Sequence, residues 1–369
     1  MSVVVAKLGT STLVDEEGQL RTEVLEARVR DLVRLRRLGY RPILVTSGAT
    51  ACGLGRLGIR ERPTALPDLQ AASAVGQGVL FQRYLELFRA HDVIPAQVLL
   101  TSADLERRSS YVNARNTLTR LLDLGVVPVI NENDTTATDE LTFGDNDVLA
   151  ARVAILMPAT WLVLLTDREG LYGVGADGAP GLIGDVPSAT HPEEVALADM
   201  GGSGLGRGGV SSKIAAATMA TGAGVTCVIA SGRAEGVLAA IASGHRVGTR
   251  FAPAERRESA FKLWLRYAKP SLGRIGVDAG AAQALRRQGT SLLPVGITGV
   301  DGGFAAGDAV DVHDAEDRLV GKGISGYSSD DLRAVAGMKS DEVRRVLPDA
   351  GTEVIHRDQF VLVESPSPR

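Results

Sequence analysis

The sequence predicts an α/β protein of two domains, a three-layer αβα domain with a largely parallel sheet and a small, mostly β domain after it. The chain of 369 residues is longer than one ordinary domain. As far as Arg250, apolar runs alternate with amphipathic stretches, and beyond it short β-like runs are separated by tight turns. Alternating strands and helices are typical of a parallel sheet covered on both faces.

The first domain contains the alternating elements. Apolar runs predict strands over residues 2–8, 42–46, 94–100, 126–130, 161–165 and 225–229. Apolar residues at helical spacing predict helices over residues 23–38, 68–88 and 113–124, with two more that start at Asp147 and after Lys213. Gly39 is placed to end the first of these helices.

The second domain begins near Gly273. Its β-like segments are residues 273–278, 291–300, 307–314, 318–325 and 353–363, and residues 279–288 and 330–336 are helical in pattern. We therefore expect a first domain at residues 1–255, a linker at 256–272, a second domain at 273–363 and a tail at 364–369.

Composition indicates a cytoplasmic protein that acts on a small molecule. No apolar run approaches the roughly 20 residues of a membrane span, and the first residues lack the charged start of a signal peptide. Cys52 and Cys227 are expected to be reduced thiols, and the five histidines have no metal-ligand spacing. A net charge of −4 gives no support for general nucleic-acid binding.

The Gly-rich run SGLGRGGVSSK, residues 203–213, has the chemistry of a phosphate-binding loop. Glycines let backbone N–H groups converge on an anion, and the helix expected after the run adds partial positive charge. Lys213 supplies a full charge, but no Ser or Thr follows it, so the run does not match the P-loop pattern GxxxxGK[ST]. Taken alone, the run could also be a flexible surface loop.

Polar loops follow the predicted strands, where parallel sheets place their sites. These loops are KLGTS, TSGAT, NENDTTATDE and TDREG. Lys7 ends the first strand, and burying an unpaired ammonium is costly, so it must find an anion unless it is an ordinary surface lysine. Gly9 lets a phosphate come close, and Lys7 and Lys213 together could flank a transferring phosphoryl group.

The segment FGDNDVLAA places Asp145, Asn146 and Asp147 where a loop meets a helix. Asp145 or Asn146 could simply cap that helix. The remaining groups could orient the lysines or bind a substrate amine, and Asp134 offers a further carboxylate. Ser47, after the second strand, suits a substrate carboxylate, with an ordinary turn as the alternative.

No Ser-His-Asp or Cys-His set is recognisable, and no histidine falls in the strand-end loops as a general base. A hydroxyl acceptor usually needs a base to remove its proton, whereas a carboxylate is already anionic near neutral pH. The sequence therefore favours a carboxylate as phosphoryl acceptor.

The strand-end motifs occur in an order that resembles the glutamate-phosphorylating members of the amino acid kinase family. These motifs are KLGTS, VTSGA, VPVINEND, FGDND, LLTDREGLY and SGLGRGGVSSK. The resemblance extends to YVNARNTL at residues 111–118, and SLLPVGI, GDAV and GISGYSSDDLR resemble the PUA domain attached to many bacterial members. It implies transfer of the γ-phosphoryl group of ATP to the side-chain carboxylate of L-glutamate, the first committed step toward proline.

The resemblance also implies roles for individual residues. Lys7 and Lys213 resemble lysines that stabilise the transferring phosphoryl group, and Asp147 resembles the carboxylate that organises them. The residues that resemble glutamate-binding positions are Ser47, Asp134 and Asn146. The nucleotide-binding positions it implies are Lys7, Gly9, Thr166, Asp167, Arg207, Gly208, Gly209, Val210, Ser211, Ser212 and Lys213. Mg²⁺ is expected to bridge the phosphates, with no metal site made by the protein alone.

Partners and regulation follow from the same resemblance. It implies a homo-oligomer, either a dimer or a tetramer, and inhibition by proline, for which the loop at residues 131–146 is the candidate. The lability of the product implies a partner, the reductase that consumes glutamyl phosphate. An alternative function is RNA binding or assistance to RNA modification through the PUA-like domain. From Gly273 onward, however, eleven Lys and Arg stand against fifteen Asp and Glu, which disfavours a phosphate backbone.

Overall fold

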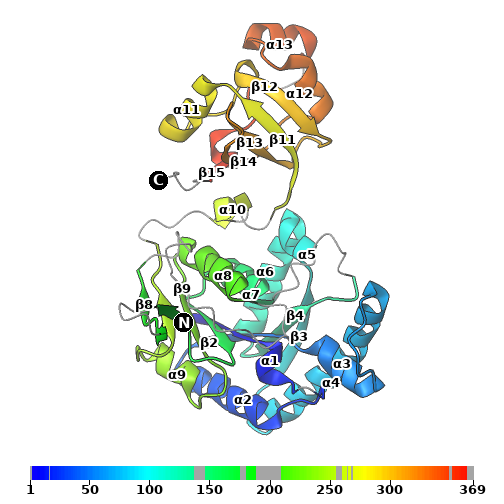
Figure 1. Ribbon diagram of the computed structural model, residues 1–369, viewed down its shortest axis with the longest axis vertical. Helices are drawn as coiled ribbons and strands as arrows, with labels where there is room; N and C mark the ends of the chain where they lie inside the picture. Colours follow the sequence, from blue (N-terminus) through cyan, green and yellow to red (C-terminus); the bar gives the residue numbers. More distant parts are fainter. Residues whose placement is uncertain are drawn as a thin grey trace. The chain divides into compact units, whose positions relative to one another are not determined.

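The computed structural model describes residues 2–15, 17–136, 146–174, 180–187, 209–254, 260–263, 265–266, 269–348 and 351–363. The chain forms two compact units, Met1–Glu258 and Ser259–Arg369 (Figure 1). Each unit is built around its own main sheet.

The first unit contains an eight-stranded sheet in the order β3-β4-β2-β1-β5-β9-β10-β8. Its parallel strands are β1 (Val3–Leu8), β2 (Arg41–Thr46), β3 (Pro95–Leu100), β4 (Val127–Glu132), β5 (Trp161–Thr166) and β9 (Thr226–Ser231). At one edge, β10 (Thr249–Phe251) runs antiparallel to β9, and β8 (Asp185–Val186) is parallel to β10. The prediction of a largely parallel sheet is confirmed.

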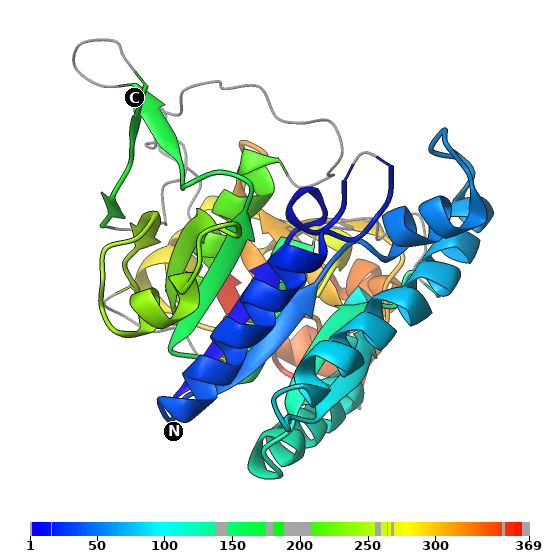
Figure 2. The same cartoon turned by 90° about the horizontal axis from the view of Figure 1, so that it is seen from below.

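Helices cover both faces of this sheet, as the continuous apolar strands require (Figures 1 and 2). One layer contains α2 (Thr22–Arg37), α4 (Leu66–Arg89) and α9 (Val237–Ala242). The other contains α6 (Arg108–Asp123), α7 (Asn146–Leu156) and α8 (Val210–Gly222). Central strands such as β1 and β5 are buried along almost their whole length. The three-layer prediction is therefore confirmed as well.

Several short elements have no counterpart in the sequence-based expectation. They include α1 (Thr10–Leu13), α3 (Ala49–Leu57), α5 (Ser102–Glu106), β6 (Tyr172–Val174) and β7 (Pro180–Leu182), and also β8, α9 and β10. Helix α3 has small residues instead of an apolar stripe because it packs backbone against backbone on α4. A Cβ atom on its Gly53 would lie 1.7 Å from the carbonyl oxygen of Ala72. Such close packing removes the periodicity that predicts a helix.

The start of α8 also differs from expectation. The helix was expected after Lys213, but it begins at Val210, with Gly209 as its N-cap. Lys213 therefore lies within the first turn of the helix. The two serines before it do not delay the helix, because Ser is readily accommodated at helix starts.

The second unit is a small domain around a five-stranded sheet in the order β12-β11-β13-β14-β15. The strands are β11 (Ser271–Val277), β12 (Ile297–Gly302), β13 (Ala309–His313), β14 (Leu319–Ile324) and β15 (Phe360–Leu362). Its helices are α10 (Ala260–Leu263), α11 (Ala279–Gln288), α12 (Ser329–Val335) and α13 (Ser340–Val346). The predicted β-like segment 291–300 is split, because a 3-10 turn at Pro294–Gly296 precedes β12.

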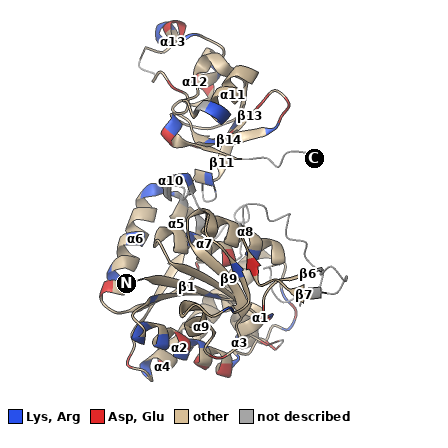
Figure 3. Cartoon of the chain, turned by 90° about the vertical axis from the view of Figure 1, so that its left-hand side faces the viewer, with Lys and Arg blue, Asp and Glu red and all other residues tan. Residues whose placement is uncertain are grey.

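Charged positions of the second unit are of both signs and interspersed (Figure 3). A buried apolar cluster that includes Val310, Leu332 and Phe360 holds its helices on the sheet.

In the part of the chain that the structure describes, no helix is both long and apolar enough to cross a membrane. Cys52 and Cys227 are buried and free, and burial raises the pKa of the Cys52 thiol to about 11.

Candidate active site

The sheet lines up the candidate residues at the carboxyl ends of neighbouring strands. Lys7, on β1, pairs in register with Val45 of β2 and Leu164 of β5. Ser47 directly follows β2, and Thr166 ends β5. Because β4 lies beyond β2, the sheet order sets the loop after β4 on one side of Lys7 and Thr166 on the other.

Lys7 and Lys213 are joined by one carboxylate. The Lys7 Nζ atom lies 2.6 Å from Asp147 Oδ1, and the Lys213 Nζ atom lies 3.1 Å from Asp147 Oδ2. The Asp147 side chain is fully buried, and those of the two lysines are 6% and 13% exposed. Asp147 stands in the first turn of α7, so two helices and a central strand meet at this group.

The charges of the lysines decide the ionisation of Asp147. Burial alone raises the pKa of this carboxyl, but the charges and hydrogen bonds of Lys7 and Lys213 outweigh it and hold the pKa below its ordinary value. Ser212 adds a hydrogen bond, its hydroxyl donating to Asp147 Oδ2 over 3.3 Å. Two ammonium groups against one carboxylate leave a net positive charge that an anion can neutralise.

Two glycines keep the surroundings of these cations open. A Cβ atom on Gly9 would lie 3.6 Å from Lys7 Nζ, within van der Waals contact of the ammonium. Gly209 caps α8 without a side-chain hydrogen bond. The first N–H groups of a helix have no intrahelical partner and attract anions. The start of α8 thus adds to the positive potential that Lys213 creates.

A polar network lies next to the lysine pair, because Asn146 directly precedes Asp147. The Asn146 side-chain amide donates to Ser47 Oγ over 2.9 Å, to the Thr46 carbonyl over 3.1 Å and to Asn131 Oδ1 over 3.0 Å. Among the described residues, the side-chain carbonyl oxygen of Asn146, Oδ1, is buried without a hydrogen-bond partner. An unpaired buried acceptor is costly, so this oxygen fits a donor on a bound molecule.

Asp134 lies at the margin of this network. Its Oδ2 atom accepts a 2.5 Å hydrogen bond from the Ser73 hydroxyl of α4. The Asn131 amide donates to Gln77 of the same helix over 2.6 Å. The structure therefore brings Ser47 and Asn146 into direct contact and links Asp134 to α4.

Thr166 and Asp167 lie on the other side of Lys7. The Thr166 hydroxyl donates to Asp167 Oδ1 over 2.9 Å, and the Thr166 carbonyl accepts from the N–H of Gly232 over 2.6 Å. Of the segment expected to bind nucleotide, Gly209 to Lys213 are described at the start of α8. Arg207 and Gly208 lie outside the described residues.

Three residues of the network were not predicted to bind substrate: Asn131, Ser73 and Gln77. Asn131 falls within the NEND motif, at the end of a strand, which was a usable signal. Ser73 and Gln77 lie on α4, on a stretch rich in small residues that also holds Gly76. Contact between this helix and the β4 loop depends on tertiary packing, which the sequence pattern does not express.

The site suits phosphate oxygens better than a bare metal ion. Both oxygens of Asp147 face lysines, which makes this carboxylate a poor metal ligand. Within the described ranges, no group of three or more His, Cys, Asp or Glu could hold a metal ion.

The chain belongs to the amino acid kinase family: the model of that family matches residues 2–231, and a PUA domain model matches residues 273–347. It is therefore a kinase in which an αβα domain is joined to a PUA domain. Three relatives, each named glutamate 5-kinase, align with 98% of this chain. The protein of Synechococcus sp. (strain JA-3-3Ab) is 46% identical over 98% of its own length. Those of Moorella thermoacetica and Myxococcus xanthus are 44% identical over 96% of theirs.

Proposed function

We propose that this chain is a glutamate 5-kinase, which transfers the γ-phosphoryl group of ATP to the side-chain carboxylate of L-glutamate. The products are L-glutamyl 5-phosphate and ADP, and the reaction is the first step of proline biosynthesis. The similarity to proteins named glutamate 5-kinase over nearly the whole chain supports the substrate. The observation that carries the chemistry is the bridge from Lys7 through Asp147 to Lys213.

Phosphoryl transfer here needs charge stabilisation more than proton transfer. One carboxylate oxygen of glutamate forms the new bond to phosphorus, and the bond from phosphorus to the oxygen that ADP keeps breaks. The attacking carboxylate is already anionic at neutral pH, so no general base is required. Lys7 and Lys213 stabilise the charge on the transferring oxygens, while Asp147 fixes both ammonium groups in advance.

The Asn146 network is proposed to hold the glutamate. The unpartnered carbonyl oxygen of Asn146 suits the α-ammonium group, and the Ser47 hydroxyl can donate to a carboxylate. Asp134 offers a second anionic partner for the ammonium group. Because Asn146 and Asp147 are consecutive in α7, the acceptor would be bound next to the lysines.

The nucleotide is proposed to lie on the β5 side of Lys7. Its expected contacts are Lys7, Gly9, Thr166, Asp167, Arg207, Gly208, Gly209, Val210, Ser211, Ser212 and Lys213. The start of α8 suits the phosphates, because its N–H groups and Lys213 attract anions. Mg²⁺ bound with the nucleotide supplies further charge neutralisation of the phosphates.

A trapping assay tests the proposal. Purified protein with ATP, Mg²⁺, L-glutamate and hydroxylamine should form glutamyl hydroxamate, since hydroxylamine captures an acyl phosphate. D-glutamate, L-aspartate and N-acetyl-L-glutamate serve as matched acceptors. Trapping with aspartate or N-acetylglutamate alone, and none with L-glutamate, contradicts the assignment.

Feedback inhibition by proline is proposed for the same site. Proline shares the α-carboxylate and a cationic nitrogen with glutamate, so it can compete with glutamate for the Asn146 network. Residues 137–145 of the candidate loop lie outside the described residues. Assays at several glutamate concentrations should show inhibition that high glutamate relieves, and indifference to proline at every ratio removes this proposal.

A further inference from the structure

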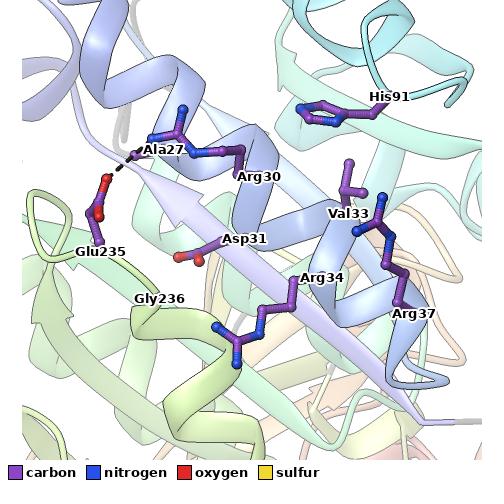
Figure 4. Close-up of a pocket in the computed structure, with 9 residues that line it drawn as sticks. All are labelled: Ala27, Arg30, Asp31, Val33, Arg34, Arg37, His91, Glu235 and Gly236. Carbon is purple, nitrogen blue, oxygen red and sulfur yellow. Dashed lines mark hydrogen bonds and ion pairs between the residues drawn. The ribbon is translucent and has the colours of Figure 1, made fainter.

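A second polar pocket lies on the outer side of α2, and none of the proposed catalytic or nucleotide-binding residues lines it. Its volume is about 640 Å³. Arg30, Arg34 and Arg37 of α2 line it, together with His91, which follows α4, and Glu235, just before α9 (Figure 4). A volume of this order is common for small-molecule sites.

The charges of this pocket do not balance. Glu235 forms an ion pair with Arg30 at 3.2 Å. Asp31, in the floor, forms one with the buried Arg28 at 3.0 Å. In the described part of the chain, no ion pair joins Arg34 or Arg37 to an acidic residue. The charge of Arg34 also acts on Asp31. Four arginines, Arg28 in the floor and three on the lining, stand against two acidic groups, so positive charge remains in excess.

The arginines border one pocket. Their spacing of four and then three residues puts them on the same face of α2, and all three line the pocket. The Arg30 side chain reaches toward Glu235, and the Arg34 side chain reaches toward Gly236 (Figure 4). Like charges at this spacing repel each other, and an anion between them relieves the repulsion. Each guanidinium is a planar fork that matches the oxygens of phosphate or carboxylate.

The floor beneath the arginines is held by buried polar contacts. The fully buried Arg28 donates to the carbonyl oxygen of Ala234, and the N–H of Leu238 donates to Asp31 Oδ2 over 3.4 Å. These contacts tie α2 to the segment that carries Glu235. The pocket walls are therefore positioned before any ligand arrives, which lowers the cost of binding.

We propose that this pocket binds a small molecule with at least two anionic groups, either phosphates or carboxylates. Arg34 and Arg37 contact the anionic groups. Arg30 borders the ligand and keeps its ion pair with Glu235. His91 contributes a further donor on the far side. The site is separate from the proposed kinase site, so the two assignments can fail independently.

Isothermal titration with inorganic pyrophosphate, without nucleotide or Mg²⁺, tests this site. Wild-type protein is compared with Arg34→Glu/Arg37→Glu and with the control Arg120→Glu/Arg287→Glu. The control residues are also exposed arginines in the last turns of helices. Both double substitutions therefore change the net charge, and the charge near a helix C-terminus, by the same amount. Pyrophosphate bound at the kinase site is common to all three proteins and cancels in the comparison.

The expected result is a binding component that weakens at least about tenfold in Arg34→Glu/Arg37→Glu and stays unchanged in the control. Citrate is the second probe: the same component with citrate shows that carboxylates suffice, and its absence narrows the ligand to phosphates. If thermal unfolding shows that Arg34→Glu/Arg37→Glu is not folded, the neutral variant Arg34→Gln/Arg37→Gln takes its place. The proposal is overturned if the wild type and the pocket variant bind pyrophosphate equally. It is also overturned if the wild type binds a hexaglutamate peptide but binds neither pyrophosphate nor citrate at this site.

Discussion

Asp147 is the residue on which the two lysines depend. Asp147→Asn preserves the shape of the side chain and removes the charge that holds Lys7 and Lys213. We expect kcat to fall by about 10²–10³-fold, the usual cost of losing one element of transition-state stabilisation. Steady-state kinetics with hydroxylamine trapping measures this loss.

The control for this substitution is Asp123→Asn. Asp123 also pairs with a cation, Arg41, at 2.9 Å, but both side chains are partly exposed. Exposed ion pairs contribute at most about 1 kcal/mol to stability, so this variant should keep wild-type kcat. Equal kcat for Asp147→Asn and Asp123→Asn contradicts the assigned role of the bridge.

Asn146 should behave differently from its neighbour Asp147. Asn146→Ala removes the donor to Ser47 and the buried unpartnered carbonyl oxygen. A hydrogen bond to a charged substrate group is worth about 1.5–3 kcal/mol, so the KM for glutamate should rise about tenfold or more. The KM for ATP should change little. A larger effect on the KM for ATP than on that for glutamate would place Asn146 on the wrong side of the site.

At the scale of elements, α3 and α4 are joined at two glycines. A Cβ atom on Gly76 of α4 would lie 1.8 Å from the carbonyl oxygen of Ala49, which forces the helices apart. We expect Gly76→Ala to lower the free energy of unfolding by about 1–3 kcal/mol or more, as overpacking does. Urea unfolding monitored by circular dichroism measures the change.

Gly78 is the matched control, since it lies on the same helix with no atom near its Cβ position. Gly78→Ala should leave stability unchanged or raise it by about 0.4–1 kcal/mol, because alanine reduces the freedom of the unfolded chain. Equal effects of the two substitutions would show that the α3–α4 contact is not tight.

The same pair of helices shows what sequence pattern can and cannot predict. The six parallel strands β1 to β5 and β9 were predicted within one or two residues, since their apolar runs are continuous and bounded by polar loops. The short strands β6, β7, β8 and β10 were not predicted. Helix α3 was missed because its small residues serve a backbone contact. The beginning of α8 was placed too late because Ser211 and Ser212 look like loop residues until the helix is seen.

At the scale of the molecule, the candidate site was predicted as a set of strand ends, but not its internal order. Lys7, Ser47 and Thr166 could be identified because each follows or ends an apolar run. Their order across the site depends on how strands pair, which is decided by packing between distant segments. The contacts of α4 with Asn131 and Asp134 were unpredictable for the same reason.

The second unit should depend on pH through Asp314. Hydrogen bonding to Arg286, with further bonds to Arg318, lowers the pKa of this carboxyl well below its ordinary 3.8. A lowered folded pKa contributes stability that is complete above the unfolded pKa and is lost as the pH falls below it. Asp314→Asn should therefore destabilise the second unit at pH 7, and its difference from wild type should shrink in acid.

Hydrogen exchange of β13 and β14 in urea measures this difference for the second unit alone. Asp341→Asn is the control, because Asp341 is 88% exposed and lies 3.9 Å from Arg344. That variant should match wild type at both pH values. A stability difference between Asp314→Asn and wild type that widens in acid would contradict a lowered pKa for Asp314 in the folded protein.

Transfer of an oxygen atom shows directly whether the side-chain carboxylate of glutamate attacks the γ-phosphorus. L-glutamate labelled with ¹⁸O in that carboxylate is incubated with ATP, Mg²⁺ and hydroxylamine, and the released phosphate is analysed by ³¹P NMR. Hydroxylamine attacks the acyl carbon, so the bridging oxygen leaves with phosphorus. We expect phosphate that carries a single ¹⁸O atom from glutamate. Unlabelled phosphate, formed by attack of water on ATP, would contradict it.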